Sequence, residues 1–303
     1  MKFLKFKNSG GGAFLSSSKV FLGGCKNIEN CYNGDVLYHN YSGVRMKKSG
    51  AFTLAEVLIT LGVIGVVSAI TLPLLVSSYQ KFVLKNQFKK SYSIISNALR
   101  NIEADLGYTP QCYYWDKSPY GPHRCVEYSE KGECMKYEMS DGSPLPPDLN
   151  GAFQECPTCR TELKNNLKVI KVCKGNAKKE KCIPDYKGTD VVKKAENDSL
   201  TDYEINVALS GCGAWKQDSI DKKNWVYVLA DGQILMTYGS DLPFSIFMID
   251  VNGKKGPNKW GHDMFGVQVV ANKGTPLKLS GNGCMVVEKG GVYTTTMIRN
   301  MNQ

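Results

Sequence analysis

The most apolar part of the chain runs from residue 52 to residue 76, FTLAEVLITLGVIGVVSAITLPLLV. Its only ionisable side chain is Glu56. About 20 consecutive apolar residues can span a bilayer as a helix, so the pattern predicts a transmembrane helix. A carboxylate within such a helix is costly and usually has a function. Arg45, Lys47 and Lys48 precede the run, and the positive-inside rule therefore predicts a cytoplasmic N-terminus and an extracytoplasmic C-terminal bulk.

After this run the apolar pattern becomes periodic over residues 77–107. Apolar side chains recur there at spacings of three and four, with one wider gap, at Tyr79, Phe82, Val83, Phe88, Tyr92, Ile95, Leu99, Ile102 and Leu106. This spacing predicts an amphipathic helix whose apolar stripe packs on a sheet. Gly107 and Pro110 mark its end. A helix continuing from residue 52 to residue 106 would be roughly 80 Å long.

Residues 108–200 show little periodicity, and we expect loops there with short elements, including a helix near residues 151–167. Sheet signals begin near Tyr203. Asp231-Gly232 between two apolar runs is a strong hairpin signal. The strands expected from the pattern cover residues 225–230, 233–238, 244–251, 265–271, 284–288 and 292–298. The sequence thus predicts an α+β fold, with the long helix on an antiparallel sheet and a Cys-rich loop insertion.

The start of the apolar run resembles the N-terminus of type IV prepilins and of the pseudopilins of type II secretion systems. In that family a basic leader ends in a small residue and a phenylalanine begins the mature chain. A glutamate follows at mature position five, and a proline often lies near position 22. Counted from Phe52, Glu56 is the fifth residue and Pro73 the twenty-second. Ala51 departs from the family's usual glycine. A plain signal anchor or a cleaved signal peptide would leave Glu56 unexplained.

The resemblance implies a pilin-like structural subunit of a type IV pilus or a type II secretion pseudopilus. A prepilin peptidase would cut between Ala51 and Phe52 and methylate the new amine of Phe52. Glu56 would pair with the terminal amine of a neighbouring subunit. The expected partners are the peptidase, other pilin or pseudopilin subunits and the inner-membrane assembly platform. The expected location is the inner membrane, single-pass with the C-terminal domain outside the cytoplasm, and the filament after assembly.

The resemblance also divides the chain. Residues 1–51 would be a leader, 52–76 the transmembrane and assembly helix, 77–107 its amphipathic half, and 108–303 an extracytoplasmic globular domain. Translation from Met46 would leave an ordinary short leader, with residues 1–45 untranslated. Of the formal net charge of +10, residues 1–51 carry +6, from eight basic and two acidic residues, and the remainder carries +4. So small a charge on the mature chain makes nucleic acid an unlikely partner.

Nine of the eleven cysteines follow residue 51: Cys112, Cys125, Cys134, Cys156, Cys159, Cys173, Cys182, Cys212 and Cys284. Disulfides are the default outside the cytoplasm, and an odd number leaves at least one thiol unpaired, metal-bound or intermolecular. Two alternatives remain. Cys156 and Cys159 with Cys173 and Cys182 could form a zinc site, although the second spacing is unusual. The CxxC could also be a redox motif.

The stretch from Asp250 to Asp263, DVNGKKGPNKWGHD, is a candidate metal loop. Asp250, Asn252 and Asp263 offer the oxygen ligands that Ca²⁺ prefers, and the loop resembles the C-terminal loop of pseudopilins, which binds calcium in some members. Lys254, Lys255 and Lys259 oppose a cation. The alternative, slightly favoured, is an Asx-turn loop that needs no metal. Beyond this candidate Ca²⁺ we expect no cofactor.

No catalytic motif accompanies the two histidines of the mature chain, His123 and His262, so we expect no enzyme activity. Two other functions remain alternatives. One is a minor pilin that binds DNA, surfaces or secreted substrate through Tyr113-Tyr114-Trp115 and the lysines of residues 164–187, although such lysines more often form a solvated face. The other, less favoured, is a membrane-anchored enzyme.

Overall fold

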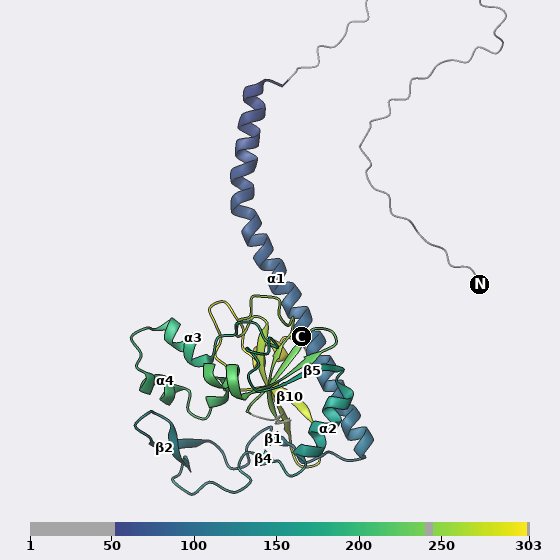
Figure 1. Ribbon diagram of the computed structural model, residues 1–303, viewed down its shortest axis with the longest axis vertical. Helices are drawn as coiled ribbons and strands as arrows, with labels where there is room; N and C mark the ends of the chain where they lie inside the picture. Colours follow the sequence, from purple (N-terminus) through teal and green to yellow (C-terminus); the bar gives the residue numbers. More distant parts are fainter. Residues whose placement is uncertain (1–51, 240–244, 302–303) are drawn as a thin grey trace, which may run out of the picture. The chain divides into compact units, whose positions relative to one another are not determined.

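The computed structural model describes residues 52–239 and 245–301 (Figure 1). By contacts the chain divides into two units, Met1–Ile59 and Thr60–Gln303. The helices are α1 (Leu54–Leu106), α2 (Cys156–Asn166), α3 (Thr189–Glu196), α4 (Asp202–Ala208) and α5 (Thr294–Arg299), with the short turns η1 (Gly213–Trp215) and η2 (Ser219–Lys223). The strands are β1 (Tyr113–Trp115), β2 (His123–Tyr128), β3 (Cys134–Met139), β4 (Gly151–Ala152), β5 (Val169–Lys174), β6 (Trp225–Leu229), β7 (Ile234–Thr237), β8 (Ile246–Asp250), β9 (Met264–Ala271) and β10 (Lys278–Gly281). The predicted α+β class is confirmed.

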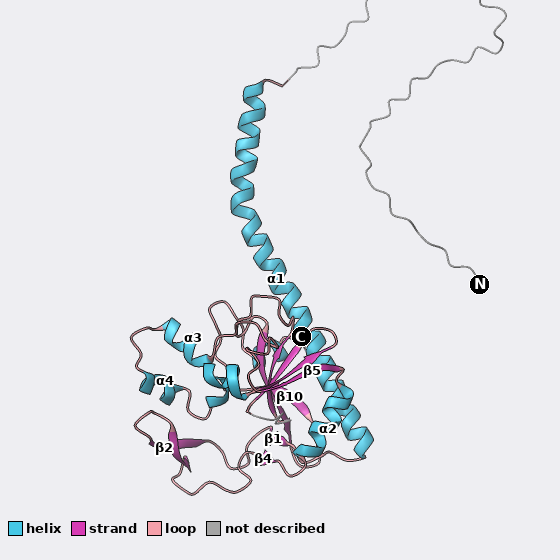
Figure 2. Ribbon diagram, in the orientation of Figure 1, coloured by secondary structure: helices cyan, strands magenta, loops and turns pink. Residues whose placement is uncertain are grey.

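Helix α1 is continuous through Pro73, as predicted. Its C-terminal half runs beside the sheet (Figure 2), and its buried residues are Leu84, Phe88, Ser91, Ile95, Ala98, Leu99 and Ile102. These positions follow a helical spacing, so one face of the helix covers the sheet. The Phe88 ring lies 4.6 Å from the Phe265 ring of β9, centroid to centroid. The predicted stripe is confirmed from Phe88 onward, but Tyr79 and Phe82 are exposed, because the packed part of the helix begins only at Leu84.

Among the described residues, eight strands form one sheet in the order β4-β1-β9-β8-β7-β6-β5, with β10 also paired to β9. The prediction of an antiparallel sheet is wrong at one junction, because β1 pairs parallel to β9, with Tyr114 opposite Val270. The other pairs are antiparallel. The sheet is therefore mixed. Local patterning could not reveal this, because the two strands that meet in parallel are distant in the sequence.

The hairpin predicted around Asp231-Gly232 is confirmed. Strands β6 and β7 pair with Val228 opposite Ile234, and Gly232 has a φ of 87°, a conformation that glycine adopts without strain. All four residues of β7 and all five of β8 are buried. The centre of the sheet is therefore covered on both faces, and this explains why these strands appear in the sequence as continuous apolar runs.

Three other expectations about strands are wrong. The sheet does not begin near Tyr203, which lies in α4, because β1, β4 and β5 precede it. Residues 284–288 are not a strand. Cys284 is tied to Cys212 by a disulfide, and its backbone N–H donates to Asn282. Residues 292–298 contain α5, where tertiary packing against β10 overrides the strand preference of consecutive threonines.

Candidate functional site

The first turn of α1 carries the motif residues Thr53 and Glu56. The Glu56 Oε2 atom accepts hydrogen bonds from the backbone N–H and the hydroxyl of Thr53, both at 2.8 Å, and the Glu56 N–H donates to Thr53 Oγ1 at 3.2 Å. This reciprocal arrangement is a capping box, which satisfies donors that a helix N-terminus leaves unpaired. Glu56 therefore caps the N-terminus of its own helix, a role that the sequence analysis did not predict. Phe52 is 84% exposed, and Ala51 lies outside the described residues.

The apolar side chains from residue 52 to residue 76 form an exposed surface along α1. Every side chain from Phe52 to Lys81 is exposed except the half-buried Ser68, and Pro73 lies within this surface. An apolar surface of this size marks a site of interaction with a membrane or with protein. Helix α1 is long and apolar enough to cross a bilayer. It is compatible with a single-pass membrane protein.

Eight of the nine cysteines after residue 51 form four disulfides, as the sequence analysis predicted for a domain outside the cytoplasm. The pairs are Cys112–Cys156, Cys125–Cys134, Cys173–Cys182 and Cys212–Cys284. The Cys125–Cys134 bond joins β2 to β3, whose two-stranded sheet is separate from the main sheet. Three of the bonds anchor segments between residues 108 and 200, where apolar periodicity is weak. Cross-links there reduce the entropy of the unfolded chain in place of a larger core.

Cys159 is the ninth cysteine and is a free, fully buried thiol. It follows Cys156 on the first turn of α2. Burial, with a smaller contribution from the charge of Glu155, raises the pKa of Cys159 to about 12. Because the thiolate is the reactive form, this residue is expected to be inert. The CxxC is therefore divided between a structural disulfide and a core thiol.

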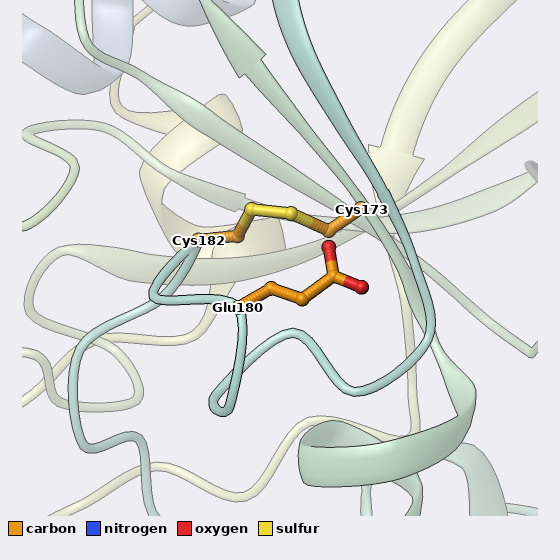
Figure 3. A group of neighbouring side chains, drawn as sticks. All are labelled: Cys173, Glu180 and Cys182. Carbon is orange, nitrogen blue, oxygen red and sulfur yellow. A yellow bond between two sulfur atoms is a disulfide. The ribbon is translucent and has the colours of Figure 1, made fainter.

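The predicted zinc set is not assembled, because three of its four cysteines are in disulfides. The acceptor atoms of Cys173, Glu180 and Cys182 do lie within 4.8 Å of one another. Figure 3 shows that two of these atoms are the sulfurs of the Cys173–Cys182 disulfide, beside the Glu180 carboxylate. Zinc binds the deprotonated thiolate, so this cluster could hold a metal only after reduction of the disulfide.

The candidate metal loop follows β8 and brings Asp250 and Asp263 together, both fully buried. Asp250 Oδ2 accepts from the Tyr186 hydroxyl at 2.6 Å, and Asp250 Oδ1 accepts from the Asn252 N–H at 3.1 Å. The Asp263 oxygens accept from the N–H groups of Asn258 and Lys259, both at 2.7 Å. All four carboxylate oxygens therefore have protein donors. This geometry agrees with the Asx-turn alternative.

The electrostatics of the loop follow from its burial. Burial raises the pKa of Asp250 to about 8, and the neighbouring Asp263 contributes, against the lowering effect of the Tyr186 hydrogen bond. Burial also raises the pKa of Asp263, against the hydrogen bonds from Lys259 and Asn258. The Asn252 side-chain amide donates to Gly256 O at 3.0 Å. Asn252 Oδ1 and Asn258 Oδ1 are buried and accept no hydrogen bond from the described residues.

The chemistry of this donor set fits a hard cation, because one loop carries two buried carboxylates and two buried amide oxygens without a hydrogen bond from the described residues. Asp250, Asn252 and Asp263 were expected from the sequence, whereas Asn258 and Tyr186 were not. Asn258 could have been included from its place in the loop. No sequence signal links Tyr186, which comes from a distant segment before α3. Calcium binding remains a prediction.

The remaining candidates have structural partners. His123 lies on β2 with its ring 5.7 Å from that of Tyr137, and His262 Nε2 is 3.2 Å from Lys289 O. Tyr113-Tyr114-Trp115 is not an aromatic loop but strand β1, in which Tyr113 is buried and the Trp115 indole donates to Asp148 O. Tyr114 and Trp115 are half-buried, so only part of the predicted aromatic surface is accessible for the binding-module alternative.

The lysines of residues 164–187 are partly engaged within the domain. Lys164 lies over the Tyr227 ring at 5.3 Å and Lys174 over the Trp225 ring at 5.2 Å. Lys178 pairs with Asp185 at 3.1 Å. These contacts fit a solvated face better than a nucleic-acid interface.

No family model, curated protein or solved structure matches the chain. The functional conclusion therefore rests on the sequence motif and on the geometry of the described residues.

Proposed function

We propose that this chain is a pilin-like structural subunit of a type IV pilus or a type II secretion pseudopilus. It is cleaved between Ala51 and Phe52 by a prepilin peptidase, methylated at the amine of Phe52, and assembled through α1. The observation that supports this most directly is the first half of α1. It combines an exposed apolar surface with one carboxylate in its first turn, while the second half of the same helix is built into a disulfide-rich domain.

An apolar helix that is exposed on all sides needs a partner. In the proposed function it has two in succession, the bilayer before assembly and the helices of neighbouring subunits afterwards. The mature protein is then an inner-membrane single-pass protein with its domain outside the cytoplasm. Four disulfides agree with that location, since disulfides persist in oxidising compartments. The assembly platform and other pilin or pseudopilin subunits are the partners.

The Glu56 carboxylate can bind the terminal ammonium of a neighbouring subunit and cap its own helix at the same time. Both Thr53 donors use Oε2, and Oε1 accepts no hydrogen bond from the described residues. A carboxylate in an apolar environment is stabilised by a nearby cation. The terminal ammonium of Phe52 on a neighbouring subunit would supply that cation once the leader is removed. The carboxylate would thus cap its own helix with one oxygen and bind the adjacent subunit with the other.

The test separates the charge of Glu56 from its capping role. Glu56→Gln removes the charge but keeps an oxygen that can accept from Thr53, since glutamine also serves in capping boxes. Glu56→Ala removes both, and Ser68→Ala is the control within the same helix. We expect all three proteins to resist carbonate extraction from membranes. Only wild type and Ser68→Ala should enter sheared filaments, detected by immunoblotting.

Normal filament entry of both Glu56 variants would refute an assembly role. If Glu56→Gln enters filaments and Glu56→Ala does not, assembly needs the capping box, and the pairing with an ammonium is refuted.

A further inference from the structure

The part of α1 just beyond the apolar run is placed to meet lipid headgroups. The run of 25 residues from 52 to 76 would be about 37 Å long as a helix, at about 1.5 Å per residue, which exceeds a hydrocarbon thickness of about 30 Å. The next turn of the helix carries Tyr79 and Phe82, which are 67% and 62% exposed. Exposed aromatic side chains directly after a membrane-length run are typical of the interface between bilayer and water.

Two cavities flank α1 at this level, with Leu84 lining both. One, of about 290 Å³, is lined by Tyr79, Val83 and Gln87 of the helix and by Lys255 and Pro257 of the loop after β8. The other, of about 250 Å³, is lined by Lys81 and Lys85 of the helix and by His262, Val292 and Asn300 of the C-terminal region. Each cavity therefore has a wall from α1 and a wall from the domain.

The charge of these cavities is positive, and it comes from lysines. Lys81, Lys85, Lys255 and His262 line them, and no carboxylate does. None of the three lysines has an ion-pair partner among the described residues, whereas Lys90, further along the helix, is paired with Asp231 at 2.8 Å. The nearest acidic groups of the loop, Asp250 and Asp263, are buried and accept hydrogen bonds from the protein.

In the proposed function these three lysines lie on the extracytoplasmic side of the membrane, where the positive-inside rule predicts few basic residues. We call Tyr79, Lys81, Phe82, Lys85, Lys255 and His262 the collar. We propose that the collar binds the phosphate of an anionic phospholipid in the extracytoplasmic leaflet of the bilayer that α1 spans. The aromatic rings occupy the interface, and the lysines and His262 face the phosphates. The proposal rests on the membrane location in the proposed function but not on filament assembly.

The consequence for the protein is that its domain is held on the bilayer surface until the subunit leaves the membrane. An attraction of this kind weakens with salt, because exposed charges are screened within about 8 Å at physiological ionic strength. Its strength should scale with the number of lysines at the surface.

The test uses the full chain reconstituted in phosphatidylcholine vesicles that contain trace spin-labelled lipid. The wild-type chain should immobilise spin-labelled phosphatidylglycerol in preference to phosphatidylcholine and phosphatidylethanolamine. The combined variant Lys81→Gln, Lys85→Gln and Lys255→Gln should lose this preference, by up to about fivefold for each lysine. A control variant with the same loss of charge carries Lys131→Gln, Lys179→Gln and Lys273→Gln, which are exposed lysines outside the collar, and should keep it.

An equal preference in the collar and control variants would overturn the proposal. So would displacement of the labelled lipid by millimolar glycerol phosphate, which would identify a site for free phosphate, or a preference for phosphatidylethanolamine. Carbonate extraction distinguishes failure of the proposed function from failure of the collar proposal. Release of the wild-type chain would overturn the proposed function together with the collar, whereas an inserted chain without lipid preference would overturn the collar alone.

Discussion

The buried carboxylate of Asp250 should make the domain less stable as the pH rises. Its pKa is about 8 in the folded protein, against 3.8 ordinarily. Between pH 4 and pH 8 the folded state therefore holds a proton that the unfolded state has lost. Stability falls with pH wherever the folded state binds more protons. The folded and unfolded pKa values of Asp250 differ by about four, and each pKa unit corresponds to about 1.4 kcal/mol. The free energy of unfolding should therefore fall by on the order of 5 kcal/mol across this range. Asp263 acts in the same direction.

The perturbation is Asp250→Asn, which resembles the protonated acid. The Tyr186 hydroxyl, which donates to Asp250 Oδ2, can instead accept a hydrogen bond from the new amide. We expect the variant to show a much flatter dependence on pH and to be more stable than wild type at pH 8. The assay is urea unfolding of the full chain in detergent from pH 4 to pH 8, with EDTA present. Tryptophan fluorescence is a suitable signal, because Trp215 and Trp260 are fully buried.

Asp218→Asn is the matched control. Its hydrogen bonds with Lys222 and Lys223 lower the pKa of Asp218 to about 2, so both its folded and its unfolded pKa lie below the tested range. This variant should keep the slope of wild type between pH 4 and pH 8. A wild-type free energy of unfolding that is level or rises over this range would refute the reasoning. An unchanged slope in Asp250→Asn would refute the assignment to Asp250.

Three further predictions follow from other parts of the structure. Phe88→Ala should cost about 3 to 5 kcal/mol in urea unfolding, because a fully buried ring packed on Phe265 is removed; the exposed Phe82→Ala should change stability by less than about 0.5 kcal/mol, and equal losses would contradict the assigned packing. If the loop binds calcium through Asp250, Asn252, Asn258 and Asp263, calorimetry should show heat on adding Ca²⁺ and a higher melting temperature that EDTA reverses; no heat and no shift would leave the Asx-turn interpretation. Mass spectrometry of the processed chain should show one thiol, Cys159, that iodoacetamide modifies only after denaturation without reductant; modification of the native protein or of several thiols would contradict the disulfide pattern.

Much of the long helix could be predicted from the sequence. A continuous apolar run predicts a membrane-length helix, and α1 is helical and exposed over that run. A stripe at spacings of three and four predicts a packed helix, and Phe88, Ile95, Leu99 and Ile102 are buried. The start of that packing could not be predicted, because Tyr79 and Phe82 continue the same pattern in a part of the helix that the sheet does not cover. The hairpin at Gly232 was predictable because its signal is local.

What the sequence by itself determined are local properties, namely the membrane-length helix, the position of Glu56 within it, the hairpin and an odd number of cysteines after residue 51. Only the tertiary structure decided which cysteines pair, that β1 joins β9 in parallel, that Tyr113 is buried in a strand, and that Tyr186 meets Asp250. Each of these depends on segments that are far apart in the chain. Their meeting is set by packing of the whole domain, which hydrophobic periodicity and turn signals within a short window do not encode.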